Sequence, residues 1–179
     1  MKKIITISRE FGSGGRTIGK IVAEKLGIPF YDKELVDHIA IQSGFAPTYI
    51  EEHGEHAPSG SMFAYAFAPQ GSHGATTGLS TADFLWSVQC KVILQLAEEG
   101  PCVIVGRNAD YILKDRTDCL HVYIHADTAY RAKRIVQLYG SSEKAPEVRL
   151  QEKDKRRRVN YHHYTGRTWG TAQNYDLCR

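Results

Sequence analysis

Residues 3–17 read KIITISREFGSGGRT, and this stretch decides the fold. Its first part, Lys3 to Ser8, is β-branched and apolar on both faces, as expected of a central parallel strand covered by helices. From Thr17 to Leu26 apolar residues recur at three- and four-residue steps, which predicts a helix. A glycine loop between such a strand and helix can turn its backbone N–H groups toward a phosphate, with the helix dipole adding favourable potential. The alternative, a plain tight turn, does not require three glycines and a serine.

The loop departs from the usual nucleotide-binding pattern, G-x-x-x-x-G-K-[ST]. If Thr17 is the hydroxyl that binds magnesium, Glu10 stands in the place of the first glycine and Arg16 in the place of the lysine. Arginine keeps the positive charge but is longer and forked, so phosphate contact is expected with a different geometry. A gapped alignment instead puts Gly15 in the lysine position and leaves Arg16 one place later.

The rest of the chain alternates between strand-like and helix-like segments. We expect further strands at 28–31, 102–105, 121–125 and 175–178, and helices after Asp32, at 79–99 and at 128–139. This alternation predicts an α/β fold, a parallel sheet with helices on both faces. Residues 53–80 are rich in Gly, Ser, Ala, Pro and His without a sustained period, so we interpret them as a mobile insertion. The charged, helix-prone segment 143–161 has little to bury and is expected to stand off the core as a lid.

Composition narrows the class of protein. A chain of 179 residues can bury a core without disulfides, and its four cysteines form no CxxC pair, so we expect reduced thiols. No stretch of about 20 apolar residues would cross a membrane, and a cytoplasmic location is expected. His53 and His56 form an H-x-x-H in the insertion, a weak metal signal because no third ligand accompanies it.

Positive charge is concentrated late in the chain. Residues 131–167 hold 11 Lys and Arg against 4 Asp and Glu, in a chain whose formal net charge is only +3, so the remainder is net negative. Such a cluster suits either a nucleic-acid backbone or the phosphates of a nucleotide. Arg131 and Arg134 share one helix face, and Lys155 to Arg158 lie in the lid. Each of these residues is either a cation that meets phosphates or a surface charge that only faces solvent.

Two further candidates follow predicted strands, at the sheet edge where ligands of open α/β folds collect. Asp32 comes after the second strand and is expected to face the acceptor or the metal, or to cap the next helix, or both. Arg107 follows the buried strand CVIV, and the alternative to a ligand contact is an ion pair with Asp110 or Asp115.

Several long strings resemble the cytidylate kinase-like proteins of the P-loop nucleoside monophosphate kinase group. They run through nearly the whole chain and are ISREFGSGGRTIG, PFYDKELV, CVIVGRNADYIL, HVYIHADTAYRAKRI, DKRRRVNYHHYTGRTWG and NYDLC. The resemblance implies a P-loop NTPase three-layer sandwich with an ATP-binding core, a monophosphate-binding region and a helical, arginine-bearing lid. It implies one P-loop kinase-like domain over 1–179, with a core at 1–44 and 81–140, the insertion at 53–80 and the lid at about 141–168.

The family's site residues carry over onto the matching positions. The resemblance implies that Arg107 contacts the acceptor phosphate, although Asn108 replaces the aspartate usually beside it, and that Arg131 lies near the adenine and the phosphates. Family members continue past NYDLC into another helix, whereas this chain ends at Arg179, as a truncated sequence would. The nucleotide-binding candidates are Gly12, Ser13, Gly14, Gly15, Arg16, Thr17 and Arg131, Thr17 is the magnesium candidate, and the catalytic candidates are Arg16, Asp32, Arg107 and Arg157.

Three functions remain open from the sequence. The first is ATP- and magnesium-dependent phosphoryl transfer to a small acceptor, most simply a nucleoside monophosphate such as CMP, with lid closure excluding water. The second is a non-catalytic nucleotide sensor, which the irregular loop favours. The third is an RNA-binding protein that uses the basic, aromatic segment 153–169, against which the net negative remainder of the chain argues. We expect nucleic acid and membranes not to be partners, and the sequence is compatible with a homodimer.

Overall fold

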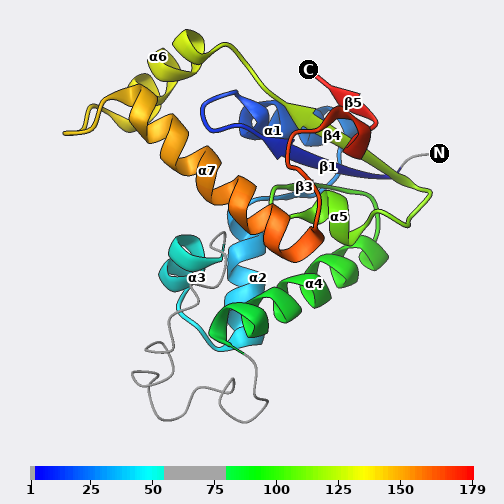
Figure 1. The fold of residues 1–179 in the computed structure, drawn as a ribbon. Coiled ribbons are helices and arrows are strands. Elements are labelled where there is room, and N and C mark those ends of the chain that lie inside the picture. Colours follow the sequence, from blue (N-terminus) through cyan, green and yellow to red (C-terminus); the bar gives the residue numbers. More distant parts are fainter. Residues whose placement is uncertain (1–2, 55–79) are drawn as a thin grey trace.

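The computed structural model describes residues 3–54 and 80–179. Its centre is a parallel sheet of five strands in the order β2-β3-β1-β4-β5 (Figure 1). The strand β1 occupies the middle, and β3 is completely buried, as their β-branched sequences predict. The strands are β1 (Ile4–Arg9), β2 (Phe30–Tyr31), β3 (Cys102–Val105), β4 (Cys119–Ile124) and β5 (Leu177–Cys178).

Helices cover both faces of the sheet. One face packs on α1, with Ala23 against Ile7 and Val105, and the opposite face packs on α2, α4 and α5, as Figure 1 shows. The α/β three-layer architecture predicted from the sequence is therefore confirmed. The helices are α1 (Gly15–Leu26), α2 (Lys33–Ser43), α3 (Pro47–His53), α4 (Thr81–Glu99), α5 (Ala109–Ile112), α6 (Thr128–Tyr139) and α7 (Pro146–Thr165), with a short 3-10 helix at Ala172–Asn174.

Most predicted elements appear with small shifts in their ends, whereas α3 and α5 were not predicted. Both are short, and a helix of four to seven residues carries too few apolar repeats to show a period. The insertion predicted at 53–80 and the H-x-x-H pattern lie almost wholly outside the described residues. Among the described helices, none is long and apolar enough to cross a membrane.

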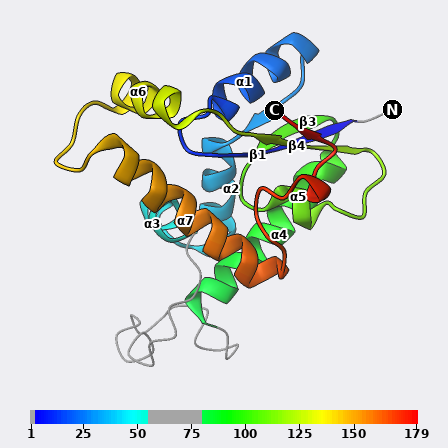
Figure 2. The ribbon, with the colours of Figure 1, turned by 45° about the horizontal axis from the view of Figure 1, so that its top comes forward.

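The helix α7 differs from its prediction. Its sequence is strongly charged and was expected to stand off the core, but α7 runs diagonally across the molecule from α6 toward α4 (Figures 1 and 2). Leu150 packs against α6, and Tyr161 is fully buried beside Tyr123 and Trp169. The expectation of a detached lid is wrong for the second half of α7, because the buried Tyr161 there anchors the helix to the sheet.

The anchor of α7 includes a buried carboxyl group. Asp110 on α5 is 3% exposed and accepts hydrogen bonds from the Ser8 hydroxyl of β1 (3.0 Å) and the Tyr161 hydroxyl of α7 (2.7 Å). Burial raises the pKa of Asp110 above its ordinary value of 3.8, because desolvation of the carboxylate outweighs the stabilising hydrogen bonds. Three elements distant in the sequence therefore meet at one titratable group.

This group predicts a specific dependence of stability on pH. A carboxyl whose pKa is raised by folding contributes fully to stability below its unfolded pKa of 3.8, and that contribution is lost as the pH rises through the folded-state pKa. We therefore expect the melting temperature of Asp110→Asn, relative to wild type, to rise as the pH increases above the unfolded-state pKa of 3.8. Thermal unfolding followed by circular dichroism would measure it. A difference that stays constant or falls with pH would contradict this role.

Candidate active site

A cavity of about 580 Å³ opens at the carboxyl ends of β1 and β2. Its size is in the range of small-molecule and cofactor sites. The loop after β1, the start of α1 and the start of α2 form one part of its wall, and α6 and α7 contribute the other. Its lining residues are Arg9, Glu10, Phe11, Gly12, Gly14, Gly15, Arg16, Thr17, Lys20, Phe30, Asp32, Lys33, Glu34, Arg134, Leu138, Tyr139 and Arg157.

The glycine loop adopts a backbone that other residues resist. Gly12 has φ +81° and Gly14 has φ +92°, both in the left-handed region. A Cβ on Gly12 would lie 2.9 Å from Ile135 Cγ2 and 3.0 Å from the Arg131 carbonyl oxygen, so α6 packs directly on the loop backbone. The loop is thus held against α6, which fixes the direction of its N–H groups.

The end of this loop fits an anionic ligand. No side chain caps the start of α1 at Gly14, and the first turn of that helix holds no acidic residue. The Ser13 hydroxyl is buried and has no hydrogen-bond partner among the described residues. Buried polar groups normally have partners, so an unpartnered hydroxyl beside uncapped N–H groups is suited to phosphate oxygens. The loop residues among the predicted ATP-binding residues, Gly12 to Thr17, therefore lie together in an arrangement that suits an anion.

Arg16 and Asp32, two catalytic candidates, form an ion pair across the cavity wall. Arg16 Nε lies 2.5 Å from Asp32 Oδ2, and the Asp32 side chain is 15% exposed. Asp32 occupies the position before α2, yet its carboxylate makes no capping hydrogen bond to that helix. The Asp32 carboxylate therefore pairs with Arg16 and does not cap α2.

Thr17, the candidate magnesium ligand, is exposed in the cavity. Its hydroxyl accepts a hydrogen bond of 2.8 Å from Arg134 Nη2 on α6. Thr17 and Asp32 both line the cavity and offer the oxygen ligands that Mg²⁺ prefers. The described residues contain no group of three or more His, Cys, Asp or Glu arranged around a metal site.

Arg131 has a different environment from the one predicted. It is 6% exposed, does not line the cavity, and donates from Nε to the Phe11 carbonyl oxygen (3.0 Å). Its Nη1 lies 2.7 Å from Glu10 Oε2, and its Nη2 lies 2.5 Å from Asp154 Oδ2. The prediction that Arg131 binds the nucleotide is therefore corrected: the guanidinium is engaged inside the protein, where it ties α6 and α7 to the loop.

Arg107 follows β3 and does not line the large cavity, but it lines a small crevice together with Arg9 and Arg157. Its Nη1 donates to the Ile50 carbonyl oxygen of α3 (3.2 Å), and its own carbonyl accepts from Gln89 Nε2 of α4 (2.9 Å). The alternative ion pair with Asp110 does not form, because that carboxyl binds Ser8 and Tyr161. Arg107 thus faces the elements between β2 and β3 and does not meet Arg16 or Asp32 in the large cavity.

The lid arginines differ in their exposure. Arg157 has a side chain only 13% exposed, lines the cavity, and donates from Nη1 to the Arg9 carbonyl oxygen at 3.2 Å. Lys155, Arg156 and Arg158 are exposed on α7. Of the four lid cations, Arg157 is therefore the one that the structure brings to the glycine loop.

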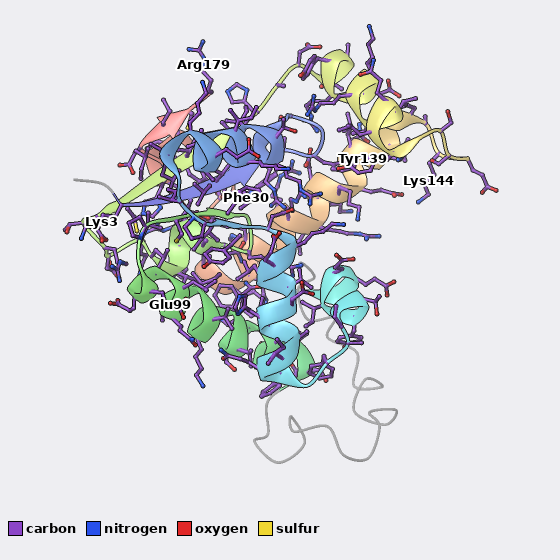
Figure 3. All side chains as sticks on the ribbon, turned by 180° about the vertical axis from the view of Figure 1, so that it is seen from behind. Lys3, Phe30, Glu99, Tyr139, Lys144 and Arg179 are labelled. Carbon is purple, nitrogen blue, oxygen red and sulfur yellow. The ribbon has the colours of Figure 1, made fainter. Side chains whose placement is uncertain are left out.

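Sequence reasoning missed the apolar end of the cavity. Phe11 and Tyr139 stack there with ring centroids 5.6 Å apart, next to Leu138. Figure 3 shows Tyr139 at the end of α6, where the chain turns toward α7. Tyr139 is 54% exposed. The sequence signal for this end of the cavity was an aromatic residue, Tyr139, at the end of an amphipathic helix. The sequence alone does not show that Phe11 stacks on Tyr139.

Comparison with protein families identifies the chain. A model of the cytidylate kinase-like family matches residues 4–178. The chain belongs to the cytidylate kinase-like family. This confirms the resemblance seen in the sequence and places the chain among the kinases. A search of curated proteins gave no match.

Solved structures share the fold. A protein from Eubacterium ventriosum is 29% identical, with a TM-score of 0.70, over 98% of this chain and 86% of that one. The shikimate kinase of Acinetobacter baumannii, solved with shikimate, is 17% identical with a TM-score of 0.54 over 99% of this chain and 82% of that one. A gluconokinase from Sinorhizobium meliloti is 19% identical with a TM-score of 0.52, over 87% of this chain and 74% of that one. The cytidylate kinase-like chain therefore has the fold of P-loop small-molecule kinases.

Proposed function

We propose that this protein transfers a phosphoryl group from ATP, with Mg²⁺, to a small acceptor, most simply a nucleoside monophosphate such as CMP. The observation that carries the proposal is the cavity in which the glycine loop meets the Arg16–Asp32 pair. The Ser13 hydroxyl of this loop has no hydrogen-bond partner within residues 3–54 and 80–179. Phosphoryl transfer asks a protein mainly for positioning and charge neutralisation, and this cavity offers N–H groups, cations and a carboxylate together.

Each residue has a role in this proposal. The backbone N–H groups from Gly12 to Thr17 bind the phosphates of ATP, and Thr17 and Asp32 would hold the magnesium ion. When bound, that ion would neutralise charge on the phosphate oxygens. Asp32 also orients the acceptor and, where the reacting group of the acceptor is a hydroxyl rather than an ionised phosphate, accepts the hydroxyl proton. Arg16 holds the Asp32 carboxylate in place. Arg157 reaches the loop from α7 and neutralises charge that develops during transfer.

The acceptor is expected near Arg107, on the side formed by α3 and α4. The fold is shared with a shikimate kinase and a gluconokinase, whose names describe acceptors that are not nucleotides. An acceptor panel should therefore include shikimate and gluconate beside nucleoside monophosphates. We propose that Arg107 binds the acceptor's anionic group, since a guanidinium suits both phosphate and carboxylate.

The RNA-binding alternative is less well supported by the geometry. Tyr161 and Trp169, two of the aromatics that could stack on bases, are buried against Tyr123. Tyr164 stacks on Trp86 with ring centroids 4.4 Å apart, so it too packs within the protein. RNA stacking needs accessible rings, and these three are engaged. The nucleotide sensor differs from the kinase only in lacking turnover, so activity must separate the two.

A coupled assay of ADP release tests the proposal. ATP and Mg²⁺ are incubated with CMP, dCMP, UMP, AMP, GMP, shikimate or gluconate, each in a separate reaction. ADP release that depends on one acceptor supports the kinase. ATP binding by calorimetry without release for any acceptor would favour the sensor, and salt-sensitive RNA binding without ATP affinity would favour the third function.

Arg157 gives a prediction for the rate of this reaction. Arg157→Met is expected to lower kcat about tenfold or more with the acceptor found in the panel, because a guanidinium near the transferring group stabilises its charge. Arg158→Met removes the same charge from an exposed position on α7 and serves as the control. Steady-state kinetics of both variants measure the effect. Equal losses in the two would show that only the net charge of the lid matters.

A further inference from the structure

The cytidylate kinase-like chain lacks a lysine in its glycine loop, so a different cation must meet the phosphates if ATP binds there. Arg16 is the nearest replacement in sequence, and in the proposed function its guanidinium holds the Asp32 carboxylate, with Nε 2.5 Å from Asp32 Oδ2. Gly15 occupies the alternative lysine position and has no side chain. The structure offers another cation on the same wall of the cavity, Arg9 at the end of β1.

Two glycines leave room for the Arg9 side chain. A Cβ on Gly15 would lie 2.6 Å from Arg9 Cβ and 3.2 Å from its Cγ, so the first part of the Arg9 side chain runs where the side chain of residue 15 would begin. A Cβ on Gly106 would lie 2.7 Å from Arg9 Cζ, so the guanidinium rests on the backbone that follows β3. A contact this short with the stem of a side chain is essentially absent from real proteins, so position 15 needs glycine while Arg9 keeps this path. Gly106 meets only the flexible end of Arg9, but its φ of +73° lies in the left-handed region that favours glycine.

The resulting position is central to the site. Arg9 lines the large cavity and also a small crevice on the Arg107 side, together with Arg157. The Arg9 carbonyl oxygen accepts the hydrogen bond from Arg157 Nη1. Arg9 therefore lies where the loop, the end of β3 and the lid helix come together, between the proposed donor and acceptor sides.

We propose that the guanidinium of Arg9 binds the terminal phosphates of ATP and takes the place of the missing loop lysine. The positive charge then comes from Arg9 at the end of β1, before the loop. Gly15, at one of the two possible lysine positions, leaves room for the Arg9 side chain. A forked guanidinium can contact two phosphate oxygens at once, whereas a lysine offers one point charge. This inference rests on the proposed function, because it assumes that ATP binds at the glycine loop.

The test compares the affinities of ATP, ADP and AMP, each with Mg²⁺, by calorimetry. Arg9→Met keeps the length of the stem and removes the charge. We expect it to lose about tenfold to a hundredfold in affinity for ATP and little for AMP, so that the ratio of the two affinities falls. Arg149→Met, on α7 and outside the cavity lining, removes the same charge and should leave the ratio unchanged.

A second variant covers the case in which Arg9→Met does not fold. Arg9→Lys keeps a positive charge on the same path and is expected to retain more of the ATP preference than Arg9→Met. The role of the Arg9 guanidinium would be overturned if whichever of these two variants folds kept the wild-type ratio of ATP affinity to AMP affinity. Arg149→Met serves as the reference for an unchanged ratio. Wild-type protein that binds none of the three nucleotides would overturn the proposed function and this inference with it.

Discussion

Replacing Asp32 by asparagine is expected to lower the rate of phosphoryl transfer about a hundredfold or more, with the protein still folded. The carboxylate lines the cavity, lies 2.5 Å from Arg16 Nε and is mostly buried. Asparagine keeps the shape of the side chain but cannot accept a proton and is a weaker ligand for Mg²⁺. The loss should therefore appear in kcat, measured by steady-state ADP release with the acceptor identified in the panel.

Asp37→Asn is the matched control for this variant. Asp37 lies on the same helix, α2, but is exposed and does not line the cavity. We expect its kcat to equal that of wild type. Asp32→Asn with an unchanged kcat would show that Asp32 serves only the structure of the loop, and the proposed roles of both Asp32 and its partner Arg16 would then be wrong.

Replacing Asp154 by alanine is expected to lower the free energy of unfolding by about 3 kcal/mol or more. Asp154 is 6% exposed, and its Oδ1 accepts a hydrogen bond from the Phe11 N–H at 2.8 Å while its Oδ2 binds Arg131. The variant leaves a buried guanidinium short of one partner and a loop N–H without its acceptor, which is the costly way to break a buried pair. Chemical denaturation would measure the loss.

Glu152→Ala provides the comparison, because Glu152 also forms an ion pair from α7. Its carboxylate lies 2.6 Å from Lys144 Nζ, about as close as the Asp154 pair, but both side chains are exposed. Exposed pairs are screened by water and salt, so we expect no measurable change in stability. If both variants lost the same stability, burial would not be what makes the Asp154 pair important.

The sheet could be predicted from the sequence because its central strands are continuously apolar. The strand at 102–105 and the helix at 128–139 have the bounds that the sequence predicts, since CVIV is apolar throughout and the helix begins after a capping Asp127. The attachment of α7 could not be predicted in this way. Its four buried residues, Leu150, Asp154, Asn160 and Tyr161, carry little weight in a segment dominated by charge, and tertiary contacts decide where such a helix lies.

The candidate site shows the same division. The glycine loop and Asp32 were predicted because each directly follows a strand, and the carboxyl ends of parallel strands share one edge of the sheet. The buried network of Arg131 could not be predicted, because its partner Asp154 lies 23 residues away and the Phe11–Asp154 hydrogen bond joins residues 143 apart. Arg9 was overlooked for a related reason: its place in the site depends on Gly106, which the sequence does not show beside it.

The central claim is that this cytidylate kinase-like protein moves a phosphoryl group to a small acceptor, and isotope transfer tests it most directly. ATP labelled with ¹⁸O in its γ-phosphoryl group is incubated with Mg²⁺ and the acceptor panel, and the products are identified by mass spectrometry. Wild-type protein is predicted to place the labelled phosphoryl group on one acceptor, and Asp32→Asn to do so far more slowly. Label that stays in ATP, or appears only in inorganic phosphate, would contradict the account.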